Sequence, residues 1–304
     1  MLLLVHILCG ALALAGAEST SAVSVPYSSQ GLDMWNTSNP VAMQQVMANL
    51  SSAFGNILTG SADSNDELDT TCSNINATSN GKWQAEGLLA SEILSPICLD
   101  QHNAPNAEAS RPYVVGNMTN VFVTEVINAF GLENQKLALT HLCNNLESSI
   151  LNAFLDGVSA IQAICATAGQ PYNANSSALH PTDSAFDSYI EAASMMFGRV
   201  FVSSATSDSQ ANLYCAHSGN HIDALDTLGL NATIVDWTIC NNTWPLTVQQ
   251  GIDAITNGTT IMFAIALTQS CISDGWSDWL CRNLDIAAMY GVGLNGTWIA
   301  DQVC

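Results

Sequence analysis

The spacing of the cysteines limits the possible folds of this chain more than any other feature. Nine cysteines follow Cys9, and eight of them form four couples whose members are 26, 22, 25 and 23 residues apart. A disulfide within each couple would close a loop of about 25 residues, which stabilises a fold by roughly 3–4 kcal/mol. Spacing favours this pairing without proving it, because eight cysteines allow on the order of a hundred connectivities. The couples are Cys72/Cys98, Cys143/Cys165, Cys215/Cys240 and Cys281/Cys304.

A phenylalanine recurs before three of these couples. Phe54, Phe197 and Phe263 each precede the first cysteine by 18 residues, in stretches whose apolar residues follow helical spacing. The second couple has Glu125 at this position, and the phrases "GLNATIVDWTIC" and "GLNGTWIADQVC" close the third and fourth couples. These patterns predict a mainly α fold with little or no β-structure, in which four tandem, disulfide-closed helical hairpins stack on one another. The piece "TIVDWTI" could add a local strand.

The order of these patterns also predicts the domain organisation. The apolar run "MLLLVHILCGALALAGA" ends on small residues, as a secretory signal peptide does, and no later apolar run is long enough to cross a membrane. We therefore expect a secreted, extracellular protein. The predicted parts are a signal peptide at 1–17, a polar N-terminal extension at 18–39, and repeat units at 40–98, 112–165, 184–240 and 245–304.

The charge balance excludes one class of partner. Five Lys and Arg residues stand against 26 Asp and Glu residues, for a net charge of −21, so the chain lacks the cations that nucleic-acid binding needs. Because 48% of the residues are hydrophobic, the acidity belongs to a folded chain rather than to a disordered tail. Nine N-glycosylation sequons would supply solubility to an exported chain with few charges. They are Asn36, Asn49, Asn76, Asn117, Asn175, Asn231, Asn241, Asn257 and Asn295.

The stretch "CAHSGNHID" is the one candidate metal site. His217 and His221 are four residues apart, so a helix would place both imidazoles on one face, with Asp223 as a third ligand. Gly219 weakens such a helix, and the glutamate of the H-E-x-x-H motif is absent, so exposed loop histidines are the alternative. No catalytic motif occurs in the sequence, and neither a catalytic residue nor a cofactor is predicted.

Two further features suggest contacts with other molecules. In "DGWSDWLC", turn residues surround Trp276 and Trp279, which makes this stretch a candidate binding site. Cys271 is the ninth cysteine, left over from the four couples. An odd cysteine in an exported protein favours an intermolecular disulfide, and a buried thiol is the alternative.

Three functions are compatible with these observations. The first is a non-catalytic structural protein of an extracellular matrix or coat, which associates with itself or with other extracellular proteins. The second is a carrier of apolar small molecules or lipids, held in a cavity between amphipathic helices that are rich in leucine and methionine. The third is a secreted hydrolase with a site assembled from distant residues.

Overall fold

The described part of the chain is helical. Its one β-type contact is an isolated antiparallel bridge between Leu146 and Cys271. The predicted signal peptide and nearly all of the N-terminal extension lie outside the described residues. The computed structural model describes residues 37–62, 64–74, 77–98, 105–131, 134–173, 180–203, 215, 219, 221–241, 246–271 and 275–304.

Each of the four predicted units contains one long helix. Three of these helices begin at a residue whose side chain accepts a hydrogen bond from a backbone N–H of the first turn, as N-cap residues do; these are Asn39, Asn106 and Thr247. Thr247 and Gln250 form a complete capping box. The long helices are α3 (Pro40–Ser61), α7 (Ala107–Asn128), α11 (Asp183–Ser203) and α15 (Val248–Ser270).

Several short helices follow each long helix, and the described residues that separate them are non-helical. The stretch "NNLESSILNAFLDGVSAIQAI" between Cys143 and Cys165 is not one continuous helix, because Glu147 is extended and donates its N–H to the Ser270 carbonyl at 2.8 Å. Asp156 then caps a new helix. The short helices are α4 (Asn65–Asn74), α5 (Ala77–Ala85), α6 (Ala90–Cys98), α8 (Gln135–Asn145), α9 (Ser148–Leu151), α10 (Gly157–Ala168), α13 (Ile222–Thr227), α14 (Ala232–Cys240), α16 (Trp276–Asn283), α17 (Ile286–Tyr290) and α18 (Gly296–Val303).

The suggested strand "TIVDWTI" is a helix. It lies within α14, where Asn231 caps the first turn and Ala232, Val235 and Ile239 are buried. Their spacing of three and four residues matches the helical period, which outweighs the β-propensity of the branched residues.

Four disulfides are present, and each joins the two members of one couple. Their Cα–Cα distances lie between 4.9 and 5.6 Å, the usual range for this bond. The mainly α fold with four disulfides is therefore confirmed. The bonds are Cys72–Cys98, Cys143–Cys165, Cys215–Cys240 and Cys281–Cys304.

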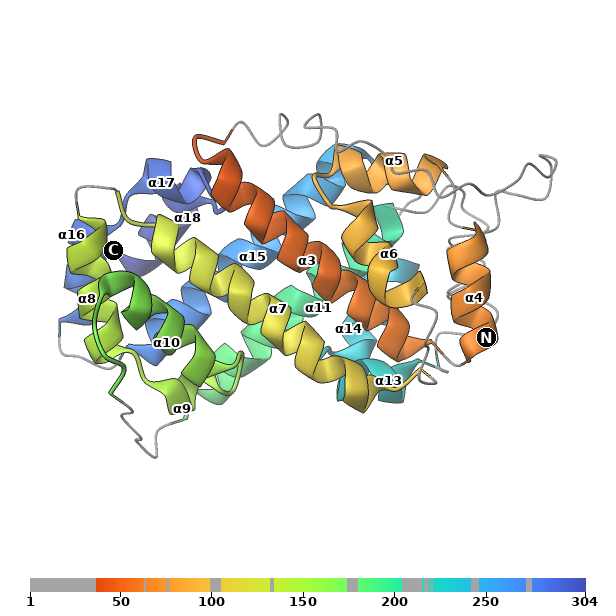
Figure 1. Ribbon diagram of the computed structural model, residues 1–304, viewed down its shortest axis with the longest axis horizontal. Coiled ribbons are helices and arrows are strands. Elements are labelled where there is room, and N and C mark those ends of the chain that lie inside the picture. The colour runs from red at the N-terminus through yellow and green to blue at the C-terminus, as the bar shows by residue number, and fades with distance from the viewer. Residues whose placement is uncertain are drawn as a thin grey trace.

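The long helices form two antiparallel pairs that face each other (Figure 1). In the first pair, the Asn39 side chain at the start of α3 bonds Asn128 at the end of α7, and Gly60 at the other end of α3 packs on Ser110. The second pair consists of α11 and α15. Aromatic contacts join the pairs, with ring centroids 5.2 Å apart for Phe54–Phe197 and 5.9 Å apart for Phe122–Phe263.

The short helices gather at the two ends of this four-helix arrangement. Helices α4, α5, α6, α13 and α14 lie at one end, and α8, α9, α10, α16, α17 and α18 lie at the other (Figure 1). There are two hydrophobic cores. The first core consists mainly of residues of the first and third predicted units, with a few others such as Val114 and Ile255. The second core consists mainly of residues of the second and fourth units, with a few others such as Ala42 and Tyr189. The predicted stacking of four tandem hairpin units on one another is not confirmed. The long helices pair as α3 with α7 and α11 with α15, and some short helices also contact the long helix two units away, as α13 contacts α3 and α9 contacts α15.

One side-chain contact recurs in all four segments. A hydroxyl on each long helix accepts a hydrogen bond, 2.8 to 2.9 Å long, from the backbone N–H of the residue just before a short helix. A phenylalanine follows each of these hydroxyl residues by three positions. In the second segment this residue is Phe122, so the recurring phenylalanine lies three residues before Glu125, where the cysteine spacing had placed it. The four contacts are Ser51–Leu89, Thr119–Asp156, Ser194–Asn231 and Thr260–Asn295.

Candidate functional site

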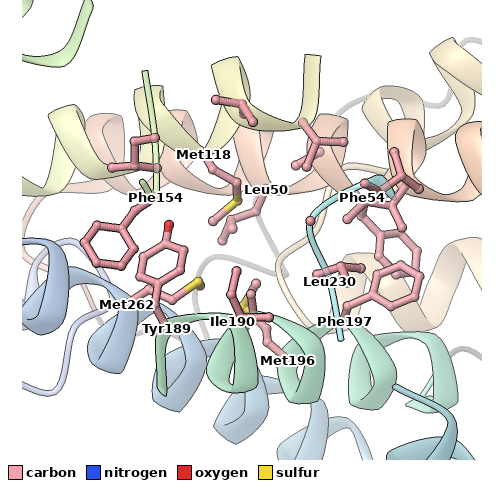
Figure 2. A pocket seen from close by; sticks show the side chains of 18 of the residues that line it. Leu50, Phe54, Met118, Phe154, Tyr189, Ile190, Met196, Phe197, Leu230 and Met262 are labelled. Atoms are coloured by element: carbon pink, nitrogen blue, oxygen red, sulfur yellow. The ribbon is translucent and has the colours of Figure 1, made fainter. Parts of the chain in front are cut away.

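An apolar cavity lies between the two pairs of long helices. Its volume is about 160 Å³, and side chains of α3 and α7 face those of α11 and α15 across it (Figure 2). One water needs roughly 10–15 Å³ of such space, so the cavity of about 160 Å³ has room for a ligand of roughly 11 to 16 non-hydrogen atoms.

Helical periodicity explains why these walls are apolar. The lining residues of α11 follow one another at spacings of three and four, as Tyr189, Ile190, Ala193, Met196 and Phe197 do. They extend from Phe186 to Val200, which at 1.5 Å per residue corresponds to about 21 Å along the helix. The cavity is therefore elongated along α11.

Aromatic side chains stand at both ends of this space. Phe154 packs on Tyr189 at one end, with ring centroids 4.8 Å apart, and Phe54 packs on Phe197 at the other. Met118 lies between these groups, and the hydroxyl of Tyr189 points towards it from the opposite wall (Figure 2). The ends are thus closed by rings and the middle is bounded by flexible side chains.

Polar groups are few on the cavity wall. Of the lining residues, all within the described part of the chain, only Arg111, Asn152 and Tyr189 have polar side chains. The side-chain oxygen of Asn152, Oδ1, already accepts a hydrogen bond from the Gly157 N–H at 2.9 Å. Arg111 is the one charged residue among the lining residues, and it is exposed.

A buried carboxyl group lies behind the Tyr189 end. Glu125 is 2% exposed and, with Tyr189, Met118 and Met262, lines a space of only about 10 Å³. Burial raises the pKa of Glu125 well above its ordinary value. Burial, and secondly the neighbouring Glu125, raises the pKa of Tyr189. Both shifts favour the neutral form of these two groups at this end of the cavity.

A second groove has a different character. It lies between α11 and α15, has a volume of about 320 Å³, and includes Arg199 and Trp298. Two of its lining residues, Asn257 and Asn295, are predicted glycosylation sites. Arg199 and the two asparagines make this groove less uniformly apolar than the first cavity, which is therefore the better candidate site for an apolar ligand.

Of the three predicted metal ligands, the structure describes His221 and Asp223, and these two lie in different surroundings. His221 is buried, with its Nδ1 3.1 Å from the Ser61 carbonyl, whereas Asp223 is exposed. His217 lies outside the described residues. Among the residues that are described, no group of three His, Cys, Asp or Glu side chains could hold a metal ion. His221 thus connects the start of α13 to the end of α3.

The two candidate binding tryptophans belong to an aromatic stack. The ring of Trp279 is 4.2 Å from that of His141 and 5.1 Å from that of Trp276. Trp276 is 6% exposed, so it does not face outward as the surrounding turn residues suggested. Burial lowers the pKa of His141. The stack joins α8 to α16 and contributes to the second core.

Cys271 is buried at the C-terminal end of α15, with 6% of its surface exposed. This placement corresponds to the buried-thiol alternative. A disulfide with another molecule would require the sulfur to become accessible.

The predicted glycosylation sites occupy different environments. Asn49 and Asn117 are half-buried, and their side chains make hydrogen bonds between α3 and α7. Asn231 and Asn295 are N-cap residues, and Asn241 and Asn257 are exposed. The remaining three, Asn36, Asn76 and Asn175, lie outside the described residues.

Comparison with protein-family models, with curated proteins and with solved structures found no match for this chain. In the ranges that the structure describes, no helix is both long enough and apolar enough to cross a bilayer.

Sequence reasoning did not identify the residues of the cavity. Tyr189 and Arg111 are not part of any motif, and the apolar spacing of a helix specifies a buried face without saying whether a space remains there. One signal was available for Arg111, which is one of only five cationic residues in the chain.

Proposed function

We propose that this protein is an extracellular carrier of apolar small molecules, which it binds in the cavity between α3–α7 and α11–α15. The elongated apolar cavity is the observation that supports this function, since binding sites for small molecules are concave, mostly apolar and contain few polar groups. Four disulfides support an extracellular location, because such bonds persist in oxidising compartments.

The proposal is tested by titrating the secreted protein with a small neutral apolar dye that the cavity can hold, 1-naphthylamine, whose fluorescence changes in apolar surroundings. We expect saturable binding of one dye per chain. Ala193→Phe adds a ring to the cavity wall and should abolish binding, because Ala193 lines the cavity on α11.

The matched control is Ser188→Phe, which adds the same ring to the exposed face of the same helix. Circular dichroism should show both variants folded, and Ser188→Phe should bind the dye like the original protein. Failure of the original protein to bind any dye, or equal binding by Ala193→Phe, would show that the cavity is not a binding site.

The structural-protein hypothesis stays a prediction, and so does the hydrolase. An intermolecular disulfide through Cys271 would have supported the structural-protein hypothesis, and the burial of Cys271 removes that support. A hydrolase that uses a metal ion would depend on His217 and His221. His217 lies outside the described residues, and Nδ1 of His221 is hydrogen-bonded with the Ser61 carbonyl.

A further inference from the structure

We infer that the cavity selects apolar chains that bear a carboxylate, and that Arg111 binds this group. This inference rests on the proposed function and adds the chemical class of the ligand. It follows from the position of one cation on a wall that is otherwise almost entirely apolar.

The wall of the cavity carries one positive charge. Arg111 is the one charged residue that lines the cavity, although the chain has 26 acidic residues and only five cationic ones. Within the described part of the chain, no carboxylate lies at ion-pair distance from its guanidinium. A planar guanidinium binds a carboxylate through two parallel hydrogen bonds, which are stronger than neutral ones.

The neighbours of Arg111 show its position along the cavity. The neighbouring Ser110 packs on Gly60 together with Leu228, so this part of α7 lies beside the C-terminal end of α3. Phe54 and Leu230 line the same end, and Tyr189 lies at the opposite end (Figure 2). A ligand with its head at Arg111 would therefore extend its chain along α11 towards Tyr189.

The net charge of −21 repels anions from the molecule as a whole. At physiological ionic strength, charges further apart than roughly 8 Å are largely screened. No acidic residue is among those that line the cavity. The local charge of Arg111 thus decides which head group is favoured at the cavity itself.

Three probes with the same alkyl chain test this inference by calorimetric titration below their micellar concentrations: dodecanoate, dodecanol and dodecyltrimethylammonium. We expect dodecanoate to bind most tightly. Arg111→Gln should weaken dodecanoate about tenfold, the effect of losing one charge-assisted contact, and leave dodecanol unchanged. Arg111→Lys should restore part of the loss.

Arg282→Gln is the control, because Arg282 is exposed on α16 and donates to the Asp278 carbonyl within its own helix. It should bind all three probes like the original protein. Equal binding of dodecanoate and dodecanol, tighter binding of the ammonium, or no effect of Arg111→Gln would overturn the selectivity while leaving the carrier function intact. If none of the probes bound, both proposals would fail together.

Discussion

Glu86 is a buried carboxyl group between two segments that are far apart in the sequence. It is 0% exposed, and its carboxyl group lies against Gly251 in the first turns of α15. Burial raises its pKa to about 8, while a hydrogen bond with Ser203 and the charge of Lys82 act in the opposite direction. The carboxyl group therefore keeps its proton in the folded protein over much of the physiological pH range.

This shift makes the stability of the protein depend on pH. The ordinary pKa of 4.5 applies to the unfolded chain, so the folded state binds the Glu86 proton more tightly. The stability from this group is fully present below pH 4.5 and is lost as the pH rises towards 8. We expect the free energy of unfolding to fall by a few kcal/mol between pH 5 and pH 8, an order-of-magnitude estimate from the linkage relation.

Urea unfolding at pH 5 and pH 8 checks this expectation. Glu86→Gln keeps the shape of the side chain and removes its titration, so the variant should lose less stability over this range than the original protein. Glu125, whose pKa burial also raises, contributes to the slope that remains. Glu191→Gln, at an exposed position on α11, is the control and should behave like the original. Identical pH slopes for Glu86→Gln and the original protein would contradict the assignment.

At the scale of helices, the four recurring hydroxyl contacts connect each long helix to one of its short helices. In the third segment, Ser194 is fully buried, accepts the Asn231 N–H at 2.8 Å and donates to the Ile190 carbonyl. Asn231 in turn caps α14. The serine therefore positions the start of α14 against α11.

We expect Ser194→Ala to lower the free energy of unfolding by about 1–3 kcal/mol, because it leaves the Asn231 N–H without its acceptor. Ser188→Ala is the matched control on the same helix, where the exposed hydroxyl bonds only the Ser184 carbonyl. Its effect should stay within about 0.5 kcal/mol. Chemical denaturation of the two variants gives the comparison, and equal effects would show that the contact to α14 contributes no stability.

At the same scale, the sequence predicted where helices occur better than where they end. The long helices follow from apolar residues spaced three and four apart, as in Leu50, Phe54 and Ile57. The break at Glu147 depends on its bond to Ser270, a residue more than a hundred positions away. Local periodicity contains no information about such a partner.

For the whole molecule, the disulfides differ in their surroundings more than in their loop lengths. Cys143–Cys165 and Cys281–Cys304 close loops of similar size, with separations of 22 and 23 residues. Both sulfurs of the first bond are in the second core, whereas Cys281 is half-buried and Cys304 is exposed. The two bonds therefore reduce the entropy of the unfolded chain by nearly the same amount. They differ in how closely the folded protein packs around them.

Replacing Cys281 and Cys304 together by alanine should lower the free energy of unfolding by about 3–4 kcal/mol, the expected effect of releasing such a loop. The same change at Cys143 and Cys165 should cost roughly 1–2 kcal/mol more, because it also leaves unfilled space in the core. Denaturant unfolding of the two double variants measures the difference. A larger loss for the C-terminal pair would mean that core packing at Cys143 and Cys165 is of minor importance.

The sequence by itself determined the helical class, the long helices and the four couples of cysteines. These properties depend on residues close together in the chain, where helical periodicity and loops of 22 to 26 residues act directly. Only the tertiary structure decided which helices pair, that Trp276 and Cys271 are buried, and that Arg111 reaches an apolar cavity. An amphipathic pattern specifies that a face is buried, but many faces of similar shape and polarity can cover it. The choice among them depends on side-chain packing between distant segments.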